Sequence, residues 1–109
     1  MKTLKLTLSK APFEVMVTGE KKEEFREGGS WIRSRLFNKD DTEREYDLIE
    51  FTNGYGAHRP SFTCKFDGFV ECYMNVATRE YSNGLKVEGI GKGDFVILCG
   101  EVTEIRNYN

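Results

Sequence analysis

The segment from Gly19 to Arg26 carries six charged residues of both signs within eight positions. If residues 20–27 form a strand, Glu24 and Arg26 project from one face, because alternate side chains of a strand share a face. Lys21 has the opposite parity, so it joins that pair only if it lies in the turn after Gly19. We therefore predict that Lys21, Glu24 and Arg26 converge on a cleft, where two cations and a carboxylate could bind an anion or exchange protons.

The charged strand lies between two helix-like segments. Ser9 can cap the first helix, and Gly19 supplies a left-handed stop at its end. A glycine pair then ends the strand, in which Phe25 is expected to face the core, and Ser30 can cap a second helix over residues 31–37. The charged residues therefore lie at a junction between elements, which is a suitable place for a cleft.

The rest of the chain has the pattern of short strands. Alternating Leu4, Leu6 and Leu8 predict a strand over residues 3–8. Further strands are expected over residues 46–51, 62–73 with an interruption at Gly68, 85–88, 95–99 and 102–105, the last two separated by Gly100. We predict one domain over residues 1–109, of α+β class, built as a small mixed β-barrel with one or two short helices near the N-terminus.

Gly19, Lys21, Glu24 and Arg26 spell G-x-K-x-x-E-x-R, which resembles the signature of the ASCH domain, a single-domain relative of the PUA fold. The surrounding order of elements is also similar, including a Gly-Asp turn before a late strand, so the resemblance covers most of the chain. The chain looks most like the small stand-alone ASCH proteins of bacteria and phages. This resemblance implies a PUA-like barrel with a charged cleft that binds RNA or a modified nucleoside or nucleotide.

Five further residues are candidate ligand contacts. Lys10, between strand and helix, is either a solvated turn residue or an anion contact. We interpret Trp31 as a core or lid residue, with base stacking as the alternative, and Arg35 on the same helix face is either a surface residue or a phosphate contact. Asn53 and Tyr55 lie in a turn, and the resemblance to phage-type ASCH proteins implies that they line the cleft, where Asn reads a base edge and Tyr stacks on it.

Hydrolysis is the alternative to binding. Some ASCH proteins look like amidohydrolases of N4-acetylcytidine, in which a lysine at the position of Lys21 activates a threonine three residues on, assisted by a distant glutamate. Here that second position is Glu24, whose carboxylate favours the charged ammonium, the wrong form for a base. Glu24 could instead activate water, with Lys21 as the oxyanion partner and Glu71 as one candidate for the distant glutamate. Lys21 and Glu24 are thus the candidate catalytic residues.

Two other functions stay open. A ribonuclease faces the absence of a second general acid, because His58 is the only histidine. A protein-interaction module would leave the charged strand solvated.

The distribution of charge is more informative than its sum of −2. Residues 1–35 contain eight Lys or Arg against five Asp or Glu, whereas residues 36–109 contain eight against thirteen. A local basic cleft on an acidic protein suits a nucleotide or the end of a nucleic acid better than a long duplex, which requires a broad basic stripe.

Cysteine and histidine usage argues against metal chemistry. Cys64, Cys72 and Cys99 form no C-x-x-C pair, so we expect buried thiols in a reducing compartment rather than disulfides or a zinc site. We expect no metal and no cofactor. Without an apolar run of membrane-spanning length or an apolar signal core after Met1, we expect a cytoplasmic protein with no membrane partner. The oligomeric state is left open.

Overall fold

The computed structural model describes residues 1–108. Its elements are β1 (Thr3–Leu8), α1 (Lys10–Val17), β2 (Glu23–Arg26), α2 (Ser30–Leu36), β3 (Leu48–Asn53), β4 (Ser61–Glu71), β5 (Arg79–Glu80), β6 (Lys86–Val87) and β7 (Phe95–Arg106). Five of the strands form one sheet in the order β1-β3-β4-β7-β2, and β5 pairs with β6 in a separate ribbon. The α+β class with two helices is as predicted, whereas the predicted small mixed β-barrel is present as a mixed five-stranded sheet that forms only half a barrel.

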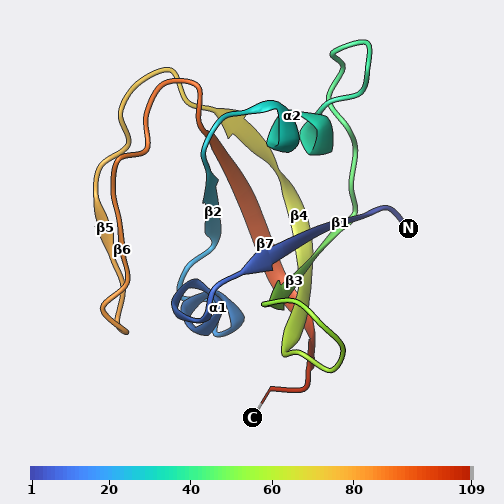
Figure 1. Ribbon diagram of the computed structural model, residues 1–109, viewed down its shortest axis with the longest axis vertical. Coiled ribbons are helices and arrows are strands. Elements are labelled where there is room, and N and C mark those ends of the chain that lie inside the picture. The colour runs from blue at the N-terminus through green and yellow to red at the C-terminus, as the bar shows by residue number, and fades with distance from the viewer. Residues whose placement is uncertain (109) are drawn as a thin grey trace.

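The main sheet is mixed and curls into half a barrel. β1 runs parallel to β3, and the other neighbouring pairs are antiparallel. Register shifts between the long strands β4 and β7 include one at Gly68, which has a φ of 97° and forms a bulge that bends β4. Figure 1 shows the resulting curl, with β1 crossing over β4 and β7. The sheet stays open because β1 and β2 are its two edges.

The hydrophobic core lies inside this curl. The alternating leucines of β1 are all buried, as the period of two predicts. Phe13 of α1 packs edge-on against Phe62, which in turn contacts Phe51. α2 contributes Ile32 and Leu36 to the same cluster. The two helices therefore cover opposite ends of the core, with α1 and α2 on either side of β1 in Figure 1.

The first helix ends where glycine was expected to stop it. α1 closes at Thr18, and Gly19 follows with a φ of 84°, a conformation that glycine adopts without strain. Ser9 occupies the N-cap position, but its side chain makes no capping hydrogen bond. The Gly19 stop matters most, because it turns the chain back toward the core before β2 begins.

Several sequence-based boundaries were wrong. The strands expected on either side of Gly100 form one continuous strand, β7, because Gly100 serves close packing instead: an added Cβ would lie 2.9 Å from Asp67 Oδ2. Gly29, not Ser30, occupies the N-cap position of α2. Cys64 is buried as expected, whereas Cys72 follows β4 and is only half-buried. The expected strand at 85–88 is present as the shorter β6, and its partner β5 was not predicted.

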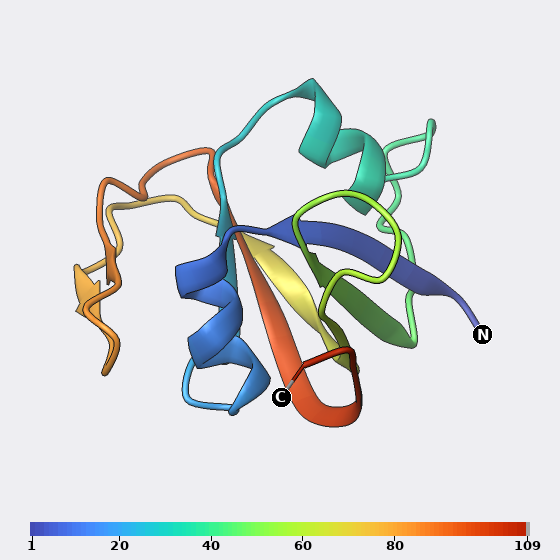
Figure 2. The same ribbon diagram turned by 60° about the horizontal axis from the view of Figure 1, so that its bottom comes forward.

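The β5–β6 ribbon stands apart from the main sheet, beside α1 and β2 (Figure 2). Its tip is attached by Ser82, whose backbone N–H and hydroxyl both donate to the carboxylate of Glu20, at 2.8 and 2.5 Å. Asn83 Nδ2 donates to the carbonyl oxygen of Ala11 at 2.9 Å. The ribbon therefore forms a wall beside the segment that carries the charged motif. Among the helices of the described chain, none is long and apolar enough to cross a membrane.

Candidate functional site

Lys21 lies in the turn between α1 and β2. This is the position that it needs in order to join Glu24 and Arg26, because its place in the strand alternation is opposite to theirs. Its backbone N–H donates to the carbonyl oxygen of Val15 at 2.9 Å, which folds the turn back against the helix. As a result the Lys21 side chain is drawn inward, and the residue is only 3% exposed. A buried lysine needs partners for its charge and its three donors.

The ammonium of Lys21 has three acceptors around it. It donates to Glu24 Oε1 at 3.3 Å, to the carbonyl oxygen of Glu23, and to Met16 Sδ at 3.6 Å. It also lies 5.2 Å from the centre of the Phe25 ring, within range of a cation–π contact. Every donor of the Lys21 ammonium therefore has a protein partner.

Glu24 connects the lysine to Arg26. Its other oxygen, Oε2, accepts from Arg26 Nε at 2.9 Å and from Arg26 Nη2 at 2.8 Å. The predicted convergence of Lys21, Glu24 and Arg26 is thus observed, and the trio carries a formal surplus of one positive charge. The expectation that Phe25 faces the core was wrong: Glu24 is the buried residue, 7% exposed, and Phe25 is half-buried outside the core cluster. Glu24 takes the inner position because the two cations compensate its charge.

Arg26 also spans the open side of the half-barrel. Its Nη2 donates to the carbonyl oxygen of Thr7 at 2.8 Å. Within residues 1–108, Nη1 of Arg26 makes no hydrogen bond or ion pair. The guanidinium is therefore held on one side by Glu24 and Thr7, and its other side keeps two donors for a ligand.

Two hollows meet at Arg26. The first, which we call the ribbon hollow, has a volume of ≈ 430 Å³; it is lined by the end of β1, by Lys21, Glu24, Phe25 and Arg26, and by the ribbon around β6. The second, the aromatic hollow, has a volume of ≈ 640 Å³ and is lined by residues 5–9, Arg26, Trp31, Gly54 and Tyr55. Both include Arg26 and residues 7–9, so the guanidinium lies on their shared boundary.

Trp31 and Tyr55 are the exposed aromatic side chains of the aromatic hollow. Trp31 was interpreted as a core or lid residue, and the core placement was wrong, because Trp31 is 50% exposed. Ile32 and Leu36 take the buried face of α2 instead, and the Arg35 guanidinium lies 5.3 Å from the Trp31 ring. Tyr55 is 87% exposed.

Other candidate residues lie elsewhere. Lys10 is exposed and lines neither hollow, and Arg35 reaches the site only through its contact with Trp31. Asn53 does not line either hollow; its carbonyl oxygen accepts from Arg59 Nε at 2.7 Å. Glu71 pairs with Arg33 of α2 at 3.1 Å, so it does not supply a distant glutamate to the buried trio.

Sequence reasoning missed Lys5 and Thr7. Thr7 contributes its backbone carbonyl oxygen, for which no side-chain pattern gives a signal. Lys5 is exposed and lines the aromatic hollow. Its position in β1 between two buried leucines already placed it on the outer face of the strand, and that alternation was the available signal.

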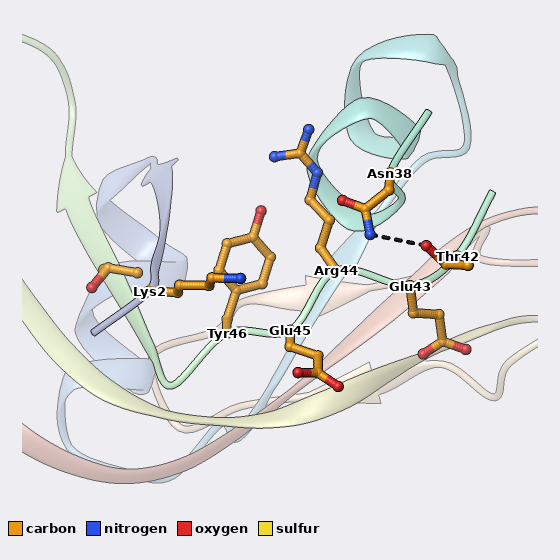
Figure 3. A pocket seen from close by; sticks show the side chains of 8 residues that line it. Lys2, Asn38, Thr42, Glu43, Arg44, Glu45 and Tyr46 are labelled. Atoms are coloured by element: carbon orange, nitrogen blue, oxygen red, sulfur yellow. Dashed lines mark hydrogen bonds between the residues drawn. The ribbon is translucent and has the colours of Figure 1, made fainter. Parts of the chain in front are cut away.

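A third hollow, of ≈ 630 Å³, lies between the start of the chain and the loop that follows α2 (Figure 3). In Figure 3, Arg44 points to the opposite side of this loop from Glu43 and Glu45. These three charged side chains therefore do not converge in the hollow. Arg44 Nε donates to the carbonyl oxygen of Phe37 at 3.1 Å, and Tyr46 Oη donates to that of Arg35 at 2.5 Å. These bonds attach the loop to α2, and the hollow has the character of a packing gap.

Cys64 and Cys99 are buried thiols in contact with each other, 0% and 8% exposed. A hydrogen bond with Cys99 lowers the pKa of the Cys64 thiol, whereas the same contact together with burial raises the pKa of Cys99 well above its usual range. His58 lies at a positive φ of 62° in the loop between β3 and β4, outside both hollows. Among the described residues, no cluster of three His, Cys, Asp or Glu side chains could hold a metal ion.

The chain matches no protein-family model, and no curated protein or solved structure is significantly similar to it.

Proposed function

We propose that this protein binds RNA or a modified nucleoside in the cleft formed by the two hollows, in the manner that its resemblance to ASCH domains implies. The observation that carries this proposal is the setting of Arg26. Its guanidinium is fixed by Glu24 and Thr7, and Nη1 keeps two donors at the boundary of the hollows. A planar cation held in place in this way suits a phosphate or a base carbonyl.

The surroundings of Arg26 support a nucleic-acid ligand. The ribbon hollow contains the half-buried ring of Phe25, and the aromatic hollow contains Trp31 and Tyr55. Unpaired bases stack on such rings, which is how proteins commonly hold single-stranded RNA. The net charge of −2 argues against a long duplex, which requires a broad basic stripe.

The same geometry favours binding over acetyl hydrolysis. A lysine that acts as a base needs a free lone pair, and the Lys21 ammonium donates to three acceptors. Both oxygens of Glu24 accept from cations, Oε1 from Lys21 and Oε2 from Arg26. Lys21 and Glu24 are better suited to orienting Arg26 than to proton transfer.

The proposal is tested by fluorescence anisotropy at two salt concentrations. The probes are fluorescein-labelled RNAs of ten nucleotides, each made of one kind of base. The wild-type protein should bind at least one of them, and Arg26→Lys should weaken binding by about 10- to 150-fold, because a charged hydrogen bond contributes about 1.5–3 kcal/mol and lysine lacks the planar fork. Lys65→Gln, which changes a 59% exposed lysine outside the cleft, is the matched control and should bind normally. Circular dichroism confirms that each variant is folded.

Two results would overturn the proposal. One is the absence of RNA and N4-acetylcytidine binding by the folded wild-type protein. The other is equal affinity of the wild type and Arg26→Lys. Acetate release from N4-acetylcytidine by the wild type, lost in Lys21→Ala and Glu24→Ala, would replace binding with hydrolysis.

A further inference from the structure

The aromatic hollow is large enough and suitably lined to hold a base of its own. It is lined by Trp31 from α2, by Tyr55 from the loop after β3, by β1 and by Arg26. Figure 1 shows β1 lying between α2 and that loop, and Figure 2 shows the loop lying over β1. A hollow of ≈ 640 Å³ exceeds what a single base requires, so a base with part of its sugar fits.

Both aromatic rings are presented on fixed backbone. Ser34 Oγ donates to the carbonyl oxygen of Trp31 at 2.6 Å, and the Arg35 guanidinium covers part of the Trp31 ring at 5.3 Å. Tyr55 lies between Gly54 and Gly56, whose φ values of 81° and 110° make the tight turn possible. The Gly54 N–H donates to the carbonyl oxygen of Leu8 at 3.0 Å, which ties this turn to β1. A backbone held in place in this way loses little freedom when a base stacks on the side chains that it carries.

The connection between the hollows sets the order of ligand groups. Because Arg26 and residues 7–9 line both hollows, a ligand that occupies both hollows crosses the boundary where Arg26 lies. The carboxylate of Glu24 is turned inward and is bound by Lys21 and Arg26. Its negative charge is therefore compensated and does not oppose a phosphate bound at Arg26. Lys5 adds an exposed cation to the aromatic hollow. A group that is anionic in the middle and aromatic at both ends matches this arrangement.

We propose that the ligand is single-stranded RNA bound through at least two consecutive nucleotides: one base against Trp31 and Tyr55, the connecting phosphate on Arg26, and the neighbouring nucleoside in the ribbon hollow beside Phe25. This inference rests on the proposed function and narrows it. A free nucleoside fills only one of the two hollows. The protein therefore reads a dinucleotide step rather than a single modified nucleoside.

The experiment compares uridine 5′-monophosphate, the dinucleotide UpU and a labelled ten-nucleotide uridine RNA, together with the adenosine and cytidine counterparts. Trp31 is the only tryptophan, so quenching of its fluorescence reports directly on the aromatic hollow in the wild-type protein. The dinucleotide and the RNA should quench it and should bind more tightly than the monophosphate. Anisotropy of the labelled RNA is used for variants that lack Trp31.

Trp31→Ala and Tyr55→Ala should each weaken RNA binding by roughly 5- to 150-fold, the effect of losing base stacking worth about 1–3 kcal/mol. Trp31→Phe, which keeps an aromatic face, should recover most of the affinity. Tyr73→Ala is the matched control, because Tyr73 is 80% exposed and lies outside both hollows. It should bind RNA as the wild type does.

The outcomes separate this inference from the proposed function. If Trp31→Ala and Tyr55→Ala bind RNA normally while Arg26→Lys binds it more weakly, the base site in the aromatic hollow is wrong and RNA binding at Arg26 stands. The inference is also overturned if the monophosphate binds as tightly as the dinucleotide and the RNA. If the folded wild-type protein binds no RNA, both proposals are wrong.

Discussion

Arg26 of β2 donates from Nη2 to the carbonyl oxygen of Thr7 in β1, at 2.8 Å. In the part of the chain that the structure describes, no backbone ladder joins these two edge strands, so this side chain closes a gap that the sheet leaves open. The same guanidinium binds Glu24, which connects the edge strands to the buried ion pair. Arg26 thus has a structural role beside the proposed role in ligand binding.

Removing the guanidinium should therefore destabilise the fold. Arg26→Gln loses the bonds to Thr7 and Glu24, and we expect the free energy of unfolding to fall by about 1.5–3 kcal/mol, the range for hydrogen bonds to charged groups. The measurement is urea unfolding followed by circular dichroism. Lys65→Gln breaks an exposed pair with Glu101 at 3.8 Å and should cost less than about 1 kcal/mol. Equal losses in the two variants would contradict the bridging role.

The Lys21–Glu24 pair should show strong coupling in a double-mutant cycle. Glu24→Gln leaves two cations without their carboxylate, for which we expect a loss of about 3–5 kcal/mol, and Lys21→Met should cost less because Arg26 still compensates Glu24. The double variant should lose less than the sum of the single losses by about 0.5–3 kcal/mol. Chemical unfolding of the four proteins measures this difference. Strict additivity would mean that the two side chains do not depend on each other.

Local sequence signals predicted where the charged trio forms. Gly19 marked the end of α1, and strand parity placed Glu24 with Arg26 and assigned Lys21 to the turn. These features depend on backbone conformation within a few residues, which residue type and spacing report directly. The α+β class, with short strands and two helices near the N-terminus, also followed from alternation and turn residues.

The orientation of each element toward the core could not be predicted in the same way. Phe25 is more apolar than Glu24, so local hydrophobicity placed the wrong one inside; the burial of Glu24 depends on Lys21 and on Arg26, whose other bond reaches a strand 19 positions away. Trp31 was interpreted as a core or lid residue because tryptophan is usually buried, but Ile32 and Leu36 already fill the core space under α2. Rotation of a short helix is set by tertiary packing, which a single sequence does not display.

The attachment of the β5–β6 ribbon should weaken in acid. Two hydrogen bonds from Ser82, the hydroxyl first and then the backbone N–H, lower the pKa of the Glu20 carboxyl. A lowered pKa in the folded protein means that this contact stabilises the ribbon above the usual pKa of a glutamate and is lost as the pH falls through the lowered value. Hydrogen-exchange protection of the Ser82 amide should therefore be high near neutral pH and lower in acid.

Glu20→Gln should remove this pH dependence, because the neutral amide has no charge to lose. Hydrogen-exchange protection of the Ser82 amide should then be low, and similar near neutral pH and in acid, after correction for the intrinsic exchange rate. Glu80→Gln changes an exposed carboxylate on the same ribbon and is the matched control. Equal pH dependence in Glu20→Gln and the wild type would show that another group holds the ribbon tip.

The glycine pair before α2 provides the sharpest packing test. A Cβ added to Gly28 would lie 2.1 Å from the carbonyl oxygen of Gly93, whereas one added to Gly29 meets nothing within 4 Å. Gly29 has an extended φ of 173°, which any residue adopts. Gly28 also donates its N–H to Asp94 Oδ1 at 2.9 Å, so it cannot move away without losing that bond.

We therefore expect Gly28→Ala to lower the free energy of unfolding by about 1–3 kcal/mol, the usual cost of forcing an extra carbon into packed structure. Gly29→Ala should be nearly neutral or slightly stabilising, because alanine restricts the unfolded chain more than glycine does. Thermal unfolding of the two variants, one residue apart and identical in chemistry, gives the comparison. Because β2 leads directly to Gly28, the same clash should loosen Arg26, and Gly28→Ala should weaken RNA binding where Gly29→Ala does not. A Gly29→Ala variant that is the less stable of the two would contradict the close approach of Gly28 to Gly93.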